Sequence, residues 1–82
     1  MLWNVYLVRC ADNSLYCGIT NNITGRIKKH NAGKGAKYTK SRLPVKLMEV
    51  SKGLSKRNAL RLEQYIKRRP AGEKIEVLKR RV

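Results

Sequence analysis

The N-terminal segment LWNVYLVRCADNSLYCGIT (residues 2–20) contains two apolar runs separated by a turn. Residues 2–10 and 15–20 are rich in β-branched and aromatic side chains, and the residues between them favour turns. This order is typical of an antiparallel hairpin. Because side chains alternate along a strand, one face should carry Trp3, Val5 and Leu7, and the other Asn4, Tyr6, Val8 and Cys10.

Signals further along the chain predict one more strand and three helices. Asn21 or Asn22 can cap a helix that runs to about residue 31, and Ser55 can cap a longer helix over about 56–69. Residues 37–42 are polar and basic, residues 45–50 alternate like a half-buried strand, and about 71–80 form a last short helix. The order β-β-α-β-α-α predicts an α+β fold with a small antiparallel sheet, in a single domain over residues 1–82.

Periodicity also predicts which faces of the last two helices are buried. The longer helix should face inward with Ala59, Leu62 and Ile66, and Leu60 should lie alongside them. The last helix should bury Ile75 and Leu78.

The charge of the chain points to a polyanionic partner. Twenty Lys and Arg residues against five acidic residues give a net charge of +15. Such a domain attracts nucleic acid first and an anionic membrane surface second, whereas solubility alone needs far less charge. A basic segment with one aromatic ring suits contact with a nucleic-acid backbone, and its candidate residues are Lys34, Lys37, Tyr38, Lys40 and Arg42, with Lys67 as a further contact.

Other features limit the location of the protein and its metal chemistry. No run of about 18 apolar residues is present, and the N-terminus lacks the features of a signal peptide, so we expect a cytoplasmic protein. Two cysteines and one histidine do not supply the four ligands of a structural zinc site. Cys10 and Cys17 are therefore expected to be small buried side chains without a disulfide.

Glu63 is a candidate metal ligand on helical geometry. It lies at the edge of the apolar stripe of its helix, where a carboxylate should be paired or coordinated. One interpretation is an ion pair with Lys67, four residues later. The other is a site for one Mg²⁺ ion, which often takes one or two protein carboxylates and completes its shell with water and phosphate.

Two further pairs of residues could contribute to phosphate chemistry. Arg26 and His30 lie one helical turn apart, so they could bind phosphate and relay a proton, or they could belong to a solvated helix face. Tyr6 and Tyr16 could be an ordinary cross-strand pair, or phenols that activate water when cations lie nearby. Gly18 would let backbone or substrate approach closely beside the second tyrosine.

Taken in order, these residues resemble the GIY-YIG nuclease superfamily. The resemblance rests on Val5-Tyr6-Leu7, on Tyr16-Cys17-Gly18, and on the later Arg26, His30 and Glu63. The stretch HNAGKGAKYT (residues 30–39) is similar to the small, stand-alone, single-domain bacterial branch of that superfamily. The name motif is degenerate here, and no asparagine follows Asn58.

The resemblance implies a three-stranded antiparallel sheet flanked by helices, and a metal-dependent endonuclease that hydrolyses DNA phosphodiester bonds. One of Tyr6 and Tyr16 would be the general base, Arg26 would hold the scissile phosphate, and His30 would assist the base or the leaving group. Gly18 matches the motif glycine, and Glu63 would bind one Mg²⁺ or Mn²⁺ ion. The alternatives are a basic nucleic-acid-binding module with the same fold and little cleavage, and an interaction or membrane-surface protein that uses its charge alone.

Overall fold

The computed structural model describes residues 1–80 and contains three strands and four helices in that range. In chain order they are β1 (Asn4–Arg9), β2 (Leu15–Thr20), α1 (Ile23–Asn31), α2 (Lys37–Lys40), β3 (Lys46–Val50), α3 (Lys56–Lys67) and α4 (Ala71–Lys79). The predicted α+β fold is therefore confirmed. The short helix α2 is an addition, because four residues are too few to leave a periodic signal in the sequence.

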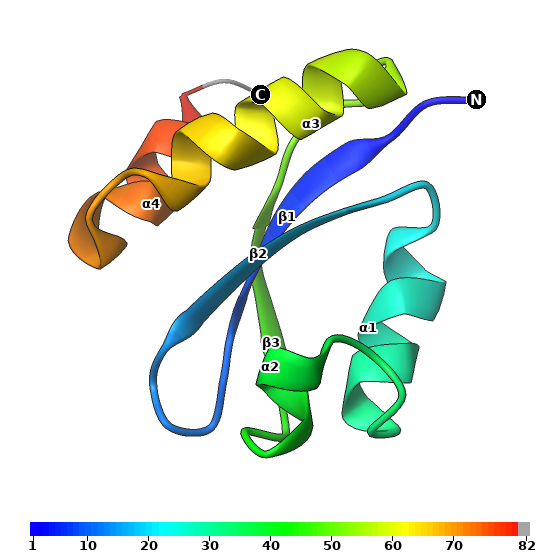
Figure 1. Cartoon of the computed structure of the whole chain (residues 1–82), viewed down its shortest axis with the longest axis vertical. Helices are drawn as coiled ribbons and strands as arrows, with labels where there is room; N and C mark the ends of the chain where they lie inside the picture. Colours follow the sequence, from blue (N-terminus) through cyan, green and yellow to red (C-terminus); the bar gives the residue numbers. More distant parts are fainter. Residues whose placement is uncertain (81–82) are drawn as a thin grey trace.

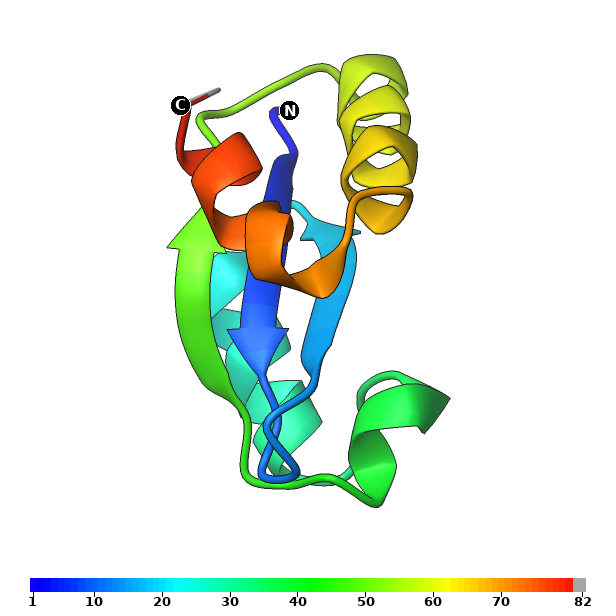
Figure 2. The ribbon, with the colours of Figure 1, turned by 90° about the vertical axis from the view of Figure 1, so that its left-hand side faces the viewer.

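The sheet has the order β2-β1-β3, with both neighbours antiparallel to the central strand β1. In the hairpin, Tyr6 lies opposite Gly18 and Val8 opposite Tyr16. Helices α3 and α4 cover one face of the sheet and α1 covers the other, as Figures 1 and 2 show from two sides. Of the three strands, the edge strand β2 lies nearest the viewer in Figure 1, and it runs between these two layers.

Each face of β1 belongs to a separate hydrophobic core, as the alternation in the sequence predicts. Val5 and Leu7 pack with Cys17 and with buried residues of α3 and α4. Tyr6, Val8 and Cys10 pack with Val45 and with partly buried side chains of α1 on the opposite face. Both cysteines are buried and free, which confirms their predicted role as small core side chains.

Helix α3 differs from the prediction at Leu60, which is 43% exposed. Ala59 and Ile66 are fully buried against the sheet, and Leu60 follows Ala59 by one residue. One residue is a rotation of about 100° around a helix, so the Leu60 side chain turns away from the sheet. No helix among residues 1–80 has the length and apolar character needed to cross a membrane.

This arrangement predicts that two substitutions on α3 lower the free energy of unfolding by very different amounts. Ile66→Ala should lower the free energy of unfolding by about 2–5 kcal/mol, because it opens a cavity in the core under α3 and α4. Leu60→Ala on the exposed side of the same helix should cost less than about 1 kcal/mol. Urea unfolding followed by circular dichroism measures both values, and equal losses would contradict this packing.

Candidate active site

The centre of the candidate site is the Tyr6 side chain, which is fully buried on the α1 side of the sheet. Its ring lies against Gly18 on the neighbouring strand: a Cβ atom at Gly18 would come within 2.6 Å of the Tyr6 hydroxyl oxygen. Glycine is required here because any side chain would displace the ring. The close approach that the sequence assigns to Gly18 is thus made by Tyr6 itself.

The Tyr6 hydroxyl joins Arg26 and His30, both on α1. Arg26 Nε donates a hydrogen bond to Tyr6 Oη at 3.3 Å, and Tyr6 Oη lies 2.9 Å from His30 Nε2. The imidazole is fully buried, and its other nitrogen, Nδ1, lies 2.8 Å from Thr39 Oγ1 on α2. Strand β1 and helices α1 and α2 therefore meet in one chain of polar side chains.

The hydroxyl of Thr39 fixes the direction of every hydrogen bond in this chain. Thr39 Oγ1 donates its only proton to the Ala36 carbonyl at 2.9 Å, so it must accept a proton from His30 Nδ1. His30 Nε2 is then the acceptor, and Tyr6 donates to it. The chain runs from Arg26 through Tyr6 and His30 to Thr39 and ends at a backbone carbonyl.

Burial and charge shift the pKa values of the groups in this chain. Burial raises the pKa of the Tyr6 phenol above 10.0, although the hydrogen bond from Arg26 acts in the opposite direction. Burial, together with the nearby Arg26 charge, lowers the pKa of His30 below 6.5. At neutral pH the resting site therefore holds a protonated phenol beside a neutral imidazole that can accept its proton.

Tyr16 lies beside this chain and is partly exposed. Its ring centre is 5.5 Å from that of His30 and 6.4 Å from that of Tyr6, and both pairs are tilted. The hydrogen bond from Arg26 to Tyr6 raises the pKa of Arg26, and the Tyr16 hydroxyl acts on the guanidinium in the same direction. The structure thus brings Tyr6, Tyr16, Arg26 and His30 together from β1, β2 and α1.

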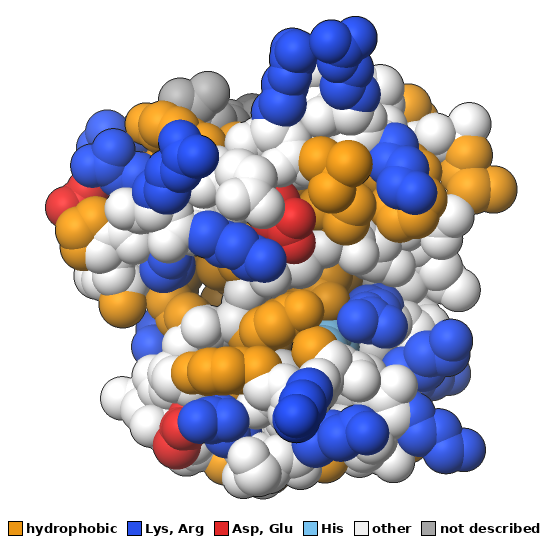
Figure 3. Space-filling view, in the orientation of Figure 1, with side chains coloured by type: hydrophobic (Ala, Val, Ile, Leu, Met, Phe, Trp, Pro, Cys, Tyr) orange, Lys and Arg blue, Asp and Glu red, His pale blue; other side chains and the backbone are white. Residues whose placement is uncertain are grey.

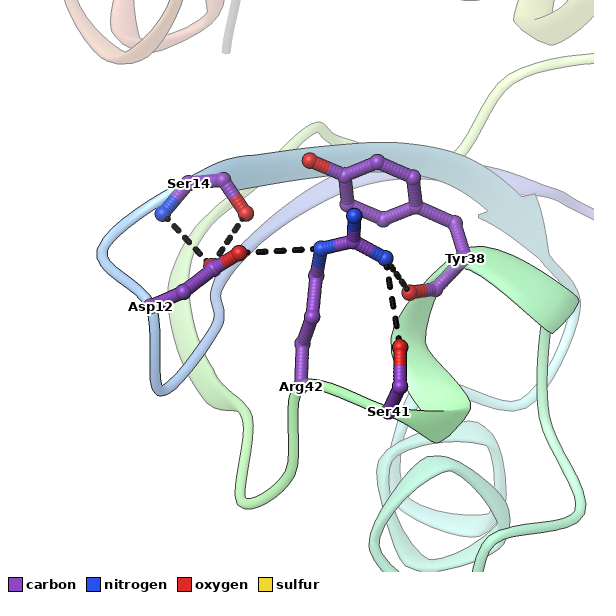
Figure 4. Close-up of polar contacts among 5 residues, drawn as sticks. All are labelled: Asp12, Ser14, Tyr38, Ser41 and Arg42. Atoms are coloured by element: carbon purple, nitrogen blue, oxygen red, sulfur yellow. Dashed lines mark hydrogen bonds and ion pairs between the residues drawn. The ribbon is translucent and has the colours of Figure 1, made fainter.

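Arg42 ties α2 to the β1–β2 turn (Figure 4). Its Nε donates to Asp12 Oδ2 at 2.9 Å, and its Nη1 donates to the Tyr38 carbonyl at 2.7 Å. The guanidinium carbon lies 4.0 Å from the centre of the Tyr38 ring, which stacks on Tyr16. Arg42, which the sequence suggests as a nucleic-acid contact, is thus occupied within the protein and holds Tyr38 against Tyr16.

The carboxylate of Glu63 lies on α3, across the edge strand β2 from this chain. It is 9% exposed, and its Oε2 is 3.4 Å from Lys67 Nζ, so the ion-pair interpretation describes the resting protein. Its negative charge acts on Cys17 of β2: burial first, and this charge second, raise the pKa of that thiol to about 12. Glu63 is therefore near β2, but among the described residues no hydrogen bond joins it to Tyr6 or Tyr16.

Basic side chains surround the face of the molecule that carries α3 above, α1 and α2 below, and the edge strand β2 between them (Figure 3). Lys34, Lys37, Lys40 and Lys67 are exposed, and Tyr38 is 40% exposed. These side chains can contact a polyanion without rearrangement of the fold. Lys67 also pairs with Glu63, so an anion that binds Lys67 would compete with that carboxylate.

Sequence reasoning did not identify two residues that build the site, Thr39 and Gly35. Thr39 is fully buried and sets the tautomer of His30. Gly35 packs so closely on the imidazole that a Cβ atom there would lie 2.8 Å from His30 Cγ. The available signal was indirect: a buried histidine needs a polar partner, and the short stretch after it is the nearest source.

Comparison with known proteins matches this chain to one family. Residues 2–74 match the GIY-YIG catalytic domain. A UPF0213 protein from Staphylococcus haemolyticus is 49% identical over 94% of this chain and 94% of its own length, and one from Nitratidesulfovibrio vulgaris is 46% identical over 94% and 70%. The solution NMR structure of the UPF0213 protein BH0048 from Bacillus halodurans has a TM-score of 0.58 and 39% identity, covering 96% of this chain and 84% of that one.

The direction of the hydrogen-bond chain predicts the protonation behaviour of His30. Long-range ¹H–¹⁵N spectra at pH 7 should show a proton on Nδ1 and none on Nε2, and the ring should titrate below pH 6.5. Because the pKa is depressed in the folded state, the unfolded chain binds more protons, so this group stabilises the fold above pH 6.5 and the contribution is lost as the pH falls. A titration midpoint of His30 at or above pH 6.5, or a proton on Nε2 instead of Nδ1, would contradict the direction of this hydrogen-bond chain.

The Arg42 contacts predict a local effect on α2. Arg42→Ala removes the ion pair with Asp12 and the cover over Tyr38, so amide hydrogen exchange within α2 should accelerate while β1 amides keep their protection. Lys40→Ala is the matched control, because Lys40 is exposed at the end of the same helix. Equal exchange in both variants would show that Arg42 does not hold α2 in place.

Proposed function

Because the chain belongs to the GIY-YIG family, we propose that it is a metal-dependent endonuclease that hydrolyses DNA phosphodiester bonds. The observation that carries the proposal is the directed chain from Arg26 through Tyr6 to His30 beside a basic surface. A binding surface alone does not need a buried imidazole aligned to accept a phenolic proton.

The proposed proton path starts at the Tyr6 hydroxyl. As a water molecule attacks the phosphorus atom and the bond from phosphorus to the leaving oxygen breaks, the proton of that water passes to Tyr6 Oη and the phenolic proton passes to His30 Nε2. The leaving oxygen takes up a proton from solvent water. His30 becomes an imidazolium that still donates from Nδ1 to Thr39. Tyr6 is therefore proposed as the general base. A phenol of raised pKa can act in this way here because His30 takes up its proton.

Arg26 would bind the scissile phosphate and, in doing so, uncover Tyr6. In the resting protein its Nε rests on the Tyr6 hydroxyl through a long hydrogen bond of 3.3 Å. A guanidinium forms stronger, charge-assisted bonds with phosphate, so the substrate would draw Arg26 from the phenol. The same charge would stabilise the developing negative charge on the phosphate oxygens.

Glu63 would hold the divalent cation. Its carboxylate is largely enclosed and paired only loosely with Lys67, at 3.4 Å, and a hard cation such as Mg²⁺ or Mn²⁺ favours oxygen ligands of this kind. Residues 1–80 contain no cluster of three or more candidate ligands, so water and substrate phosphate would complete the shell. The bound ion would act as a Lewis acid and orient the phosphate.

A basic nucleic-acid-binding module with little cleavage is the second candidate function. The ion pair between Glu63 and Lys67 favours it, because this contact occupies the proposed metal ligand. In that case the net charge of +15 would provide affinity and the buried polar chain would serve stability.

A nicking assay separates the two candidates. Purified protein should convert supercoiled plasmid to open circles in the presence of Mg²⁺ or Mn²⁺, and Glu63→Ala should abolish this without loss of DNA retention in a gel. Glu76→Ala is the matched control. It removes an exposed acidic residue of α4, a different helix from α3, that pairs with Arg80 four residues later. If the wild type retains DNA but never nicks it with either metal, the binding module is correct.

A further inference from the structure

A cleft adjoins the candidate active site, where the end of β2 meets the start of α1. Its volume is about 330 Å³, within the range of small-ligand sites, roughly 300–1,000 Å³. Arg26 lines this cleft and also donates to Tyr6, so the cleft and the proposed reaction centre share one guanidinium. The cleft is also lined by Trp3, Ile19, Asn21, Asn22 and Lys29.

The lining combines the groups that a nucleotide requires. Trp3 and Ile19 provide an apolar surface for a base, and Arg26 and Lys29 provide positive charge for phosphate. Asn22 uses its side-chain oxygen to cap Gly25, which leaves its amide nitrogen for a ligand. Among residues 1–80, the side chain of Asn21 donates only to the sulfur of Met1, an exposed side chain that a ligand can replace.

We propose that this cleft binds one unpaired nucleotide of the substrate strand, next to the phosphate held by Arg26. The inference rests on the proposed function and names a subsite of that reaction. A base that is stacked in a duplex cannot enter a concave cleft, so the nucleotide must be outside a base stack. Binding there places the adjoining phosphate at Arg26, and through Arg26 beside Tyr6 and His30.

The chain carries a built-in reporter for the cleft, because Trp3 is its only tryptophan. The ammonium of Lys56 lies 4.9 Å from the centre of this ring, and a ligand in the cleft changes the surroundings of the indole. The test is to titrate the whole protein with a single-stranded oligothymidylate and with a blunt duplex of equal length. Metal is left out so that no strand is cut. The single strand should quench or shift Trp3 emission, and the duplex should bind with little change.

Two neighbouring lysines provide the matched variants. Lys29 lines the cleft and Lys28 does not, although both are exposed on the same helix with the same charge. Lys29→Ala should weaken single-strand binding about three- to tenfold and reduce the salt slope by about one, while Lys28→Ala should change affinity less than about twofold. Asn21→Ala should reduce the Trp3 response and leave duplex affinity unchanged.

The outcomes separate this inference from the proposed function. An unchanged Trp3 signal, an equal response to the duplex, or equal losses for Lys28→Ala and Lys29→Ala would overturn the nucleotide subsite. A Trp3 response that depends on Lys29 supports the subsite even when the wild type fails to nick plasmid, and in that case only the nuclease assignment falls. If the wild type nicks plasmid but its Trp3 emission never responds to the single strand, the nuclease assignment stands and the nucleotide subsite is wrong.

Discussion

The position of the Tyr6 ring on Gly18 is the constraint on which the rest of the site depends. The ring fills the core on the α1 side of the sheet, and its hydroxyl reaches Arg26 and His30 at the same time. A side chain at Gly18 would displace the ring, and with it the link between strand and helix. One residue of the central strand therefore serves both the packing of the fold and the polar chain of the candidate site.

The same arrangement explains why a buried imidazole is stable in so basic a protein. His30 has no exposed surface, and Arg26 is close enough to lower its pKa. Both ring nitrogens of the neutral imidazole have hydrogen-bond partners within the protein, since Tyr6 donates to Nε2 and Thr39 accepts from Nδ1. A neutral histidine can be buried in this way at low cost, and it remains able to accept one proton.

Much of the fold could be predicted from the sequence, because its signals are local. The hairpin, the alternating faces of β1 and the bounds of α3 follow from turn residues and periodicity within a few positions. The four residues of α2 are too few for such a signal, and Leu60 lies one position beyond the buried stripe. The partners of Arg42 and His30 also escaped prediction: Asp12 lies 30 residues from Arg42, and only the folded chain brings Thr39 to the imidazole.

The central claim is that Tyr6, through His30, accepts the proton of the attacking water. Its most direct test is the rate of phosphodiester cleavage in Tyr6→Phe and Tyr16→Phe, each of which removes one hydroxyl and keeps the ring. The account predicts that Tyr6→Phe lowers the rate by about 10²–10⁴, the usual contribution of a general base, and that Tyr16→Phe stays within about tenfold of the wild type. Loss of cleavage in Tyr16→Phe with a nearly normal rate in Tyr6→Phe would contradict it.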